Sequence, residues 1–236
     1  KHDIHTVVHL AAVVTPPRGS GRDLAYAVDV EGTERLIDGC VAHGVQHFVF
    51  ASSGAAYGYH ADNPALLRED DPLRGNEVFA YAHHKRLAEQ YLAEARERHP
   101  ELKQLILRPG TVLGAETQNQ ITAIFDRPVV LGLRDAATPF VFIHDEDVAA
   151  IIAIGVSEQR TGVFNLAGDG VMTLREIATE LGKPFVAVPS TWLEHGLAAL
   201  DRFGAAPYGP EQVMFLKYRP VLSNEHLKRD FRYTPR

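Results

Sequence analysis

The sequence is poor in cysteine and in long apolar segments. Cys40 is the only cysteine in 236 residues. A single cysteine excludes an intramolecular disulfide and a metal site built from several cysteines, and it favours a reducing compartment. The sequence has no apolar stretch of 18 residues and no signal-peptide pattern, so neither a membrane span nor export is indicated. We therefore expect a cytoplasmic protein.

Clusters of basic residues and metal-ligand spacings are also missing. The net charge is -6 and no run of five basic residues occurs, which argues against a nucleic-acid-binding surface. His83 and His84 are adjacent on a predicted helix, where their side chains diverge by about 100 degrees, so we predict no metal site. With 45% apolar and 23% charged residues, the chain can bury the core of an ordinary globular protein.

Apolar runs alternate with helical patterns through most of the chain. Loops are predicted at 16–21 and 57–76, and 114–139 is irregular. Thr173, with Glu176 three residues later, predicts a helix start. The predicted strands are 7–12, 45–50, 105–107 and 163–166, with a strand-like stretch at 140–143, and the predicted helices are 30–42, 81–98 and one from Asp147. This alternation predicts an α/β fold with an open, doubly wound parallel sheet, whose ligands bind outside the carboxyl ends of its strands.

The most informative motif is the pentapeptide Tyr-Ala-His-His-Lys at 81–85. A helix places Tyr81 and Lys85 on one face, one turn apart. A nearby ammonium stabilises a phenolate, and each unit by which it lowers the pKa of the phenol corresponds to about 1.4 kcal/mol. A Tyr lowered in this way can exchange protons at neutral pH. The alternative interpretation is a partly exposed helix pair without a chemical role.

Small and polar residues follow the predicted strands. Ser52 and Ser53 come directly after the strand 45–50, and Pro109 ends the strand 105–107. Since the carboxyl ends of parallel strands share one edge of a sheet, we expect these residues to gather there. Ser53 is the candidate partner of the phenol, whereas we expect Ser52 to make a structural hydrogen bond at the strand end. His9 and His144 are also expected to make structural hydrogen bonds.

Five segments together resemble the extended short-chain dehydrogenase/reductases. Their order and spacing match along residues 7–149, and within this superfamily the chain is most similar to the NAD-dependent epimerase/dehydratase branch, including bacterial proteins similar to UDP-glucose 4-epimerase. The segments are His9-Leu10-Ala11-Ala12, the stretch Ser52 to Gly58, Tyr81 with Lys85, Leu107-Arg108-Pro109, and the stretch Phe142 to Ala149.

The resemblance implies a hydride-transfer site with NAD as cofactor and NADP as the alternative. Tyr81 would be the acid/base, Lys85 would lower its pKa and hold the nicotinamide ribose, and Ser53 would hydrogen-bond the reacting oxygen. The implied substrate is a nucleotide sugar contacted by Ser53, Thr111 and Arg219, and the resemblance also favours a homodimer. The implied cofactor contacts are Leu10, Ala11, Ala12, Asp29, Ala51, Ser52, Tyr81, Lys85 and Pro109.

The resemblance also implies a division of the chain into two parts. Residues 1–113, with 141–167 returning to them, would form a partial Rossmann-like dinucleotide-binding domain. Residues 114–140 and 168–236 would form a smaller substrate-binding domain. The family's first strands and its Gly-rich turn are not within these 236 residues. The stretch Gly19-Ser20-Gly21 does not replace that turn, and by the size of a βαβ unit the difference is roughly sixty residues.

Two positions depart from the family pattern. Asp29 stands where the family usually has Asn, and an ionised carboxylate cannot donate a hydrogen bond. Thr111 stands where UDP-sugar epimerases commonly carry Asn. Two alternatives therefore stay open beside the nucleotide-sugar enzyme: a reductase or dehydrogenase of a non-sugar carbonyl compound, and a non-catalytic nucleotide-binding protein. We expect Trp192 and Phe203 in a core or interface, and the basic tail 228–236 on a solvated face.

Overall fold

The computed structural model describes residues 4–14, 21–202 and 212–236. Its centre is a four-stranded sheet in the order β1-β2-β3-β8, and every neighbouring pair is parallel. The strands are β1 Thr6–His9, β2 His47–Ala51, β3 Lys103–Pro109 and β8 Gly162–Leu166. Each of them overlaps a strand predicted from the apolar runs. The α/β fold with a parallel central sheet is therefore confirmed.

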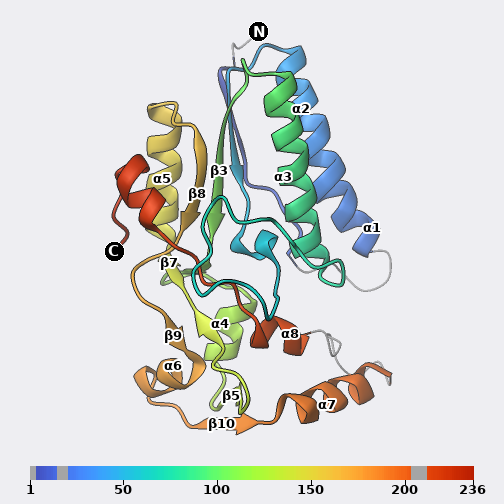
Figure 1. Ribbon diagram of the computed structural model, residues 1–236, viewed down its shortest axis with the longest axis vertical. Helices are drawn as coiled ribbons and strands as arrows, with labels where there is room; N and C mark the ends of the chain where they lie inside the picture. Colours follow the sequence, from blue (N-terminus) through green and yellow to red (C-terminus); the bar gives the residue numbers. More distant parts are fainter. Residues whose placement is uncertain (1–3, 15–20, 203–211) are drawn as a thin grey trace.

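Helices cover both faces of this sheet (Figure 1). One face carries α1 Gly21–Tyr26, the π-helical turn η1 Ala27–Glu31, α2 Gly32–Ala42 and α3 Ala80–Arg98, and the other carries α5 Asp145–Ser157 and the π-helical turn η3 Leu227–Phe231. Phe48 and Phe50 of β2 pack with α2 and α3. Val49, which lies between them, packs against α5 and η3. Alternate residues of a strand point to opposite faces, so burial of both faces explains the uninterrupted apolar run.

Three smaller sheets lie beyond the carboxyl ends of the central strands (Figure 1). β4 Thr111–Leu113 pairs with β7 Phe142–His144, β5 Val130–Leu133 with β10 Phe185–Val188, and β6 Pro139–Phe140 with β9 Met172–Thr173. The helices of this region are α4 Gln120–Phe125, α6 Leu174–Glu180, α7 Ser190–Arg202 and α8 Gln212–Lys217. Thr173 and Glu176 form the predicted capping box at the start of α6.

Two local predictions differ from the structure. The first helical segment begins at Gly21, not near Val30, and residues 16–20 of the predicted loop lie outside the described residues. The stretch predicted as irregular contains α4 and β5, whose apolar patterns are too short to recognise. Of the core and interface positions expected for Trp192, its 73% exposure on α7 excludes the core, and the interface stays a prediction. Phe203 lies outside the described residues.

The loop between η2 Gly54–Tyr57 and α3 is held close to both elements. Gly75 donates its backbone N–H to the Ala56 carbonyl at 2.9 Å, and a Cβ at position 75 would lie 2.1 Å from the Ala82 carbonyl oxygen. Gly58 has a φ of +82°, which favours glycine. These two glycines let the loop pass over the start of α3.

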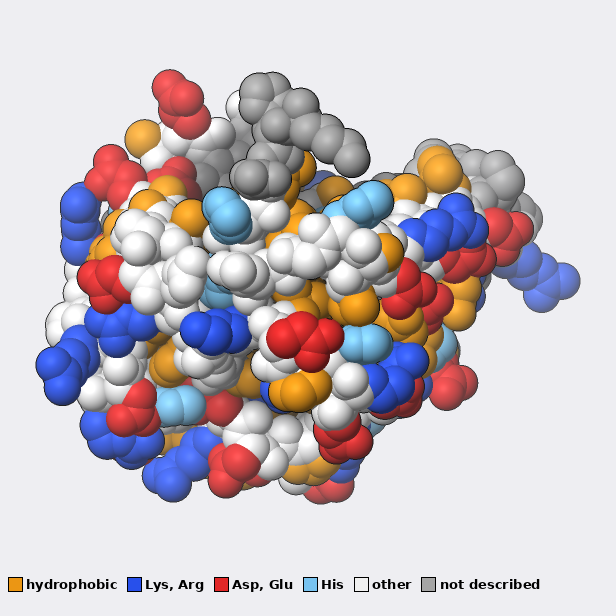
Figure 2. All heavy atoms as spheres, turned by 90° about the horizontal axis from the view of Figure 1, so that it is seen from above, with side chains coloured by type: hydrophobic (Ala, Val, Ile, Leu, Met, Phe, Trp, Pro, Cys, Tyr) orange, Lys and Arg blue, Asp and Glu red, His pale blue; other side chains and the backbone are white. Residues whose placement is uncertain are grey.

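Charges of both signs are mixed on the molecular surface (Figure 2). On the face drawn in Figure 2, Lys and Arg side chains are interspersed with Asp and Glu side chains. None of the helices in the described ranges combines the length and the apolar character that crossing a membrane requires.

Candidate active site

The carboxyl ends of β1, β2 and β3 form one edge of the central sheet, because these parallel strands are neighbours. The segment after β1 contains Leu10, Ala11 and Ala12, of which Leu10 is 57% exposed and Ala12 half-buried. Ala51 ends β2, and Pro109 ends β3. The structure therefore brings the predicted strand-end residues together.

Helix α3 adds Tyr81 and Lys85 to this edge. Both side chains lie on the helix face that packs toward β2, as their spacing predicts. Lys85 is buried, and its Nζ lies 5.8 Å from the centroid of the Tyr81 ring and 4.6 Å from that of Phe50. The ammonium donates a hydrogen bond to the Ala51 carbonyl at 2.5 Å. The helix pair is thus tied directly to the end of β2.

The two serines after β2 face different partners. Ser53 caps η2, its Oγ accepts the Ala55 N–H at 3.1 Å, and its side chain lies close enough to the Tyr81 phenol to influence its pKa. Ser52 donates to a carboxylate oxygen of Glu89 on α3. Successive side chains of an extended backbone point to opposite sides, which separates these roles. The structural hydrogen bond expected for Ser52 is therefore present, and Ser53 lies beside the phenol.

The pKa of the Tyr81 phenol shifts in the direction opposite to the one expected from the sequence. Burial raises this pKa, the Ser53 side chain lowers it, and the carboxylate of Asp29 raises it further. The Lys85 ammonium points at a backbone carbonyl, and burial lowers its own pKa to about 8. Desolvation of the phenol therefore sets the direction of its pKa shift.

Asp29 is buried in the π-helical turn η1 and makes two specific contacts. Its Oδ1 accepts the Val13 N–H at 2.7 Å, and its Oδ2 lies 3.0 Å from Nδ1 of His84. The Asp29 and His84 side chains are 2% and 4% exposed. The resemblance implies a cofactor contact for Asp29. The buried pair that Asp29 forms with His84 was not predicted. The only signal for it was an acid at a position where the family has an amide.

Glu89 and Arg108 form a second buried pair behind Lys85. Arg108 Nε lies 3.0 Å from each carboxylate oxygen of Glu89, and Nη2 lies 2.6 Å from Oε2. Arg108 Nη1 also donates to the Tyr57 hydroxyl at 2.7 Å. Glu89 was not predicted, although its spacing of four residues from Lys85 places it on the same helix face.

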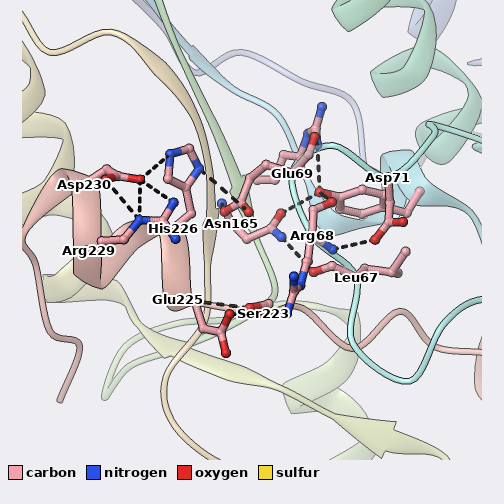
Figure 3. A network of polar contacts seen from close by, with 12 residues as sticks. Leu67, Arg68, Glu69, Asp71, Asn165, Ser223, Glu225, His226, Arg229 and Asp230 are labelled. Atoms are coloured by element: carbon pink, nitrogen blue, oxygen red, sulfur yellow. Dashed lines mark hydrogen bonds and ion pairs between the residues drawn. The ribbon is translucent and has the colours of Figure 1, made fainter.

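A polar network fastens the loop before α3 to β8 (Figure 3). The Tyr57 hydroxyl donates to Asn165 Oδ1 at 2.8 Å, and the Asn165 amide donates to the Leu67 carbonyl at 3.0 Å. The Asn165 backbone N–H donates to Glu69 at 2.7 Å, and Glu69 faces His226 near the chain end, as Figure 3 shows. The loop between η2 and α3 is thus tied to β8 by polar contacts that are partly or fully buried.

The remaining histidines of the sequence analysis make the expected structural contacts. His9 Nε2 lies 2.9 Å from the Thr33 hydroxyl, and burial together with the Lys85 ammonium lowers the pKa of His9, while Asp29 opposes this shift. His144 caps α5 by accepting the Glu146 N–H at 3.2 Å. Neither contact requires a catalytic role.

Thr111 and Arg219 meet although they are 108 positions apart. Arg219 Nη2 donates to the Thr111 hydroxyl at 3.0 Å, and the guanidinium lies over the rings of Phe140 and Phe215, 4.0 Å and 4.6 Å from their centroids. Its Nη1 is buried and has no hydrogen-bond partner within the described part of the chain. Burial lowers the pKa of Arg219 to about 10, which leaves the group cationic at neutral pH.

Comparison with known proteins gives the same fold. A solved structure described as MoeE5 in complex with UDP-glucose and NAD superposes with a TM-score of 0.73 at 21% identity, over 99% of this chain and 74% of that chain. UDP-glucose 4-epimerase of Erwinia amylovora is 31% identical over 121 residues, which cover 51% of this chain and 35% of that protein.

An uncharacterized protein of Mycobacterium tuberculosis is 24% identical over 239 residues, which cover 99% of this chain. The chain spans 62% of the length of that relative. A family model described as the NAD dependent epimerase/dehydratase family matches residues 1–167. The chain therefore belongs to the NAD-dependent epimerase/dehydratase family.

Proposed function

We propose that the protein containing this chain uses NAD to epimerise or dehydrate a nucleotide sugar. The observation that carries the proposal is the phenol of Tyr81, close to the Ser53 side chain and one turn from the buried Lys85, at the carboxyl edge of a parallel sheet. Family membership supports it. Further support comes from structural neighbours whose descriptions name UDP-glucose and NAD, or NAD with a dTDP-glucose 4,6-dehydratase.

The strand ends and Lys85 fit the nicotinamide half of NAD. An ammonium has three donors, and Lys85 makes one hydrogen bond within the described residues, to Ala51. Two donors are left for ribose hydroxyls. Leu10, which is exposed at the end of β1, and Pro109 at the end of β3 would flank the cofactor. When bound, NAD supplies the hydride acceptor and a positive ring beside the phenol.

The residues of the chain provide proton transfer and orientation. Tyr81 accepts the proton of the sugar hydroxyl that is oxidised, and Ser53 hydrogen-bonds the same oxygen. Since burial raises the pKa of Tyr81, the phenol is mainly protonated at neutral pH unless a positive charge is added. Lys85 has to remain an ammonium to help supply that charge.

Arg219 is the candidate ligand for the diphosphate of the substrate. Guanidinium groups bind phosphate oxygens through paired N–H donors, and Nη1 of Arg219 is buried without a partner among the described residues. Thr111 holds the other end of the guanidinium. This arrangement favours 114–140 and 168–236 as the substrate-binding part of the protein. A homodimer and a cytoplasmic location remain predictions.

Replacement of Tyr81 by Phe tests the proposal in the full-length protein. We expect turnover of UDP- or dTDP-hexoses to fall by at least about 10²-fold, the usual contribution of a general acid/base, while NAD binding by calorimetry is retained. Tyr91→Phe is the matched control, because Tyr91 lies on the same helix and its hydroxyl donates to Asp38.

Three results would contradict the proposal in different ways. Unchanged turnover in Tyr81→Phe would remove Tyr81 from the chemistry. Net formation or consumption of NADH with a carbonyl substrate would identify a dehydrogenase or reductase, because an epimerase returns its cofactor to the starting state. NAD binding without turnover in sugar-nucleotide and carbonyl screens would favour a non-catalytic nucleotide-binding protein.

A further inference from the structure

The segment that follows β1 has little regular structure of its own. Residues 11–14 lie outside the helices and strands, although the predicted cofactor contacts Ala11 and Ala12 belong to them. Within the described ranges, the one hydrogen bond of these four residues runs from the Val13 N–H to Oδ1 of Asp29, at 2.7 Å. A backbone segment with so few hydrogen bonds opens easily, so its place at the edge of the sheet depends on Asp29.

Asp29 is itself held from two directions. Its backbone carbonyl accepts the Thr33 hydroxyl at 2.7 Å, and that hydroxyl also lies 2.9 Å from Nε2 of His9 on β1. The second carboxylate oxygen, Oδ2, lies 3.0 Å from Nδ1 of His84 on α3. Asp29 therefore joins three parts of the chain: the segment after β1, the π-helical turn η1 and helix α3.

The contact between Asp29 and His84 is specific in its chemistry. An ionised carboxylate accepts hydrogen bonds and donates none, so opposite an ionised Asp29 the Nδ1 atom of His84 carries the proton. The ring of Tyr26, at the end of α1, meets the imidazole edge-on at a centroid distance of 5.5 Å. The Asp29 and His84 side chains are almost fully buried. Loss of either partner therefore leaves a buried polar group unsatisfied.

We propose that Asp29 and His84 are a positioning pair that fastens the segment after β1 to helix α3, and so fixes two sides of the NAD site relative to each other. His84 directly precedes Lys85 on α3, and the segment carries Ala11 and Ala12. The pair acts through the segment that it holds. The inference rests on the proposed function only where it concerns NAD.

Exchange of the Val13 amide proton, followed by NMR in the full-length protein without nucleotide, tests the contact directly. We expect Asp29→Ala to speed this exchange by about tenfold or more, the factor that corresponds to one hydrogen bond to a charged group. Asp29→Asn keeps an oxygen acceptor for the Val13 N–H, and its amide can pair with the other imidazole tautomer of His84. It should restore most of the protection. Asp23→Ala makes the same truncation on the exposed surface of α1 and should leave the exchange unchanged.

NAD binding by calorimetry separates positioning from a purely structural role. We expect Asp29→Ala to raise the dissociation constant of NAD by about tenfold, and Asp29→Asn to bring it back to within about threefold of the parent. The double variant with His84→Ala should resemble Asp29→Ala alone, because removal of Asp29 already breaks both contacts. His43→Ala is the matched control at an exposed histidine after α2. A pair that served only the stability of the fold would lower the free energy of unfolding and leave NAD binding unchanged.

Three outcomes overturn the inference. The first is unchanged Val13 exchange in a folded Asp29→Ala variant, and the second is a pair of single-variant effects on NAD binding that multiply in the double variant. If Asp29→Ala does not fold, His84→Ala decides, and a dissociation constant equal to that of the parent is the third. A parent protein that does not bind NAD would contradict the proposed function instead, and the Val13 exchange would still decide whether Asp29 holds the segment.

Discussion

At the scale of single residues, burial of ionisable groups dominates the chemistry of this site. Burial favours the neutral phenol of Tyr81 and lowers the pKa of Lys85 to about 8, so the phenol stays protonated at neutral pH and the ammonium loses its proton only above about pH 8. The Asp29 carboxylate raises the pKa of both groups. A negative charge at this position therefore favours the ammonium of Lys85 and opposes ionisation of Tyr81.

This balance predicts a pH dependence of cofactor binding. Lys85 has a pKa of about 8, so it is charged below this pH and loses its proton as the pH rises through it. We expect the dissociation constant of NAD to increase as the pH rises above about 8. Calorimetry over roughly three pH units, from about 6.5 to about 9.5, measures this dependence. Lys85→Arg should flatten this rise, since a guanidinium stays protonated throughout.

The matched control for this titration is Lys103→Arg, which makes the same change at an exposed lysine at the start of β3. It should retain the full pH dependence of the parent. A dissociation constant in the parent that stays constant through pH 8 would show that the Lys85 ammonium does not contribute to NAD binding.

The sequence predicted the placement of Tyr81, Lys85 and Ser53 better than the direction of the Tyr81 pKa shift. The helical spacing of Tyr81 and Lys85 and the position of Ser53 after β2 were sufficient to place all three at one edge. The direction of the Tyr81 pKa shift was not predictable, because it depends on how completely the phenol is desolvated. His84 was also missed, since a histidine beside a motif reveals nothing about a carboxylate 55 positions away.

At the scale of elements, α3 is fastened to the sheet by one buried polar stripe. Tyr81, Lys85 and Glu89 follow each other at intervals of four residues, and each meets a residue at or next to a strand end. Lys85 binds Ala51, Glu89 binds Ser52, and Arg108 closes the contact from β3. The stripe thus serves the placement of the chemical groups and the packing of the helix at once.

Glu89→Gln should destabilise the protein strongly. Removal of one partner of a buried ion pair leaves the other charge uncompensated, which costs about 3–5 kcal/mol. Urea denaturation followed by circular dichroism measures the free energy of unfolding. Glu97→Gln is the matched control on the exposed face of the same helix and should change it by less than about 0.5 kcal/mol. Equal stability of the two variants would show that the Glu89–Arg108 pair is energetically neutral.

The long helix α3 and the strands of the central sheet were predictable, whereas α4 and β5 were not. The sequence placed α3 from Tyr81 to Arg98 because its pattern runs for several turns, and the apolar runs of β2 and β3 located the strands of the central sheet. α4 and β5 contain six and four residues. In these two segments the residue pattern covers too few periods to distinguish a helix from a strand. Tertiary contacts, such as the parallel pairing of β5 with β10, determine their conformation.

At the scale of the whole molecule, the last segment of the chain returns to the carboxyl edge of the central sheet. Arg219 reaches Thr111, and Leu222 pairs in a parallel bridge with Leu67 in the loop before α3. η3 then packs on the far face of the sheet. The resemblance had pointed to Thr111 and Arg219 separately, but only the folded chain shows that one holds the other.

Arg219 should therefore control how the folded protein responds to a nucleoside diphosphate. A ligand at a hundredfold excess over its dissociation constant adds about 2.7 kcal/mol of stability, or roughly 5–10 °C in Tm for a chain of this size. We expect UDP or dTDP to give such a rise in the full-length protein and Arg219→Lys to abolish most of it, since an ammonium cannot make the paired contacts of a guanidinium.

Arg229→Lys is the control, because Arg229 is exposed and pairs with its neighbour Asp230. The comparison uses the difference between Tm with and without nucleotide, so any loss of intrinsic stability in the variant cancels. An equal rise in both variants would exclude Arg219 as the diphosphate ligand.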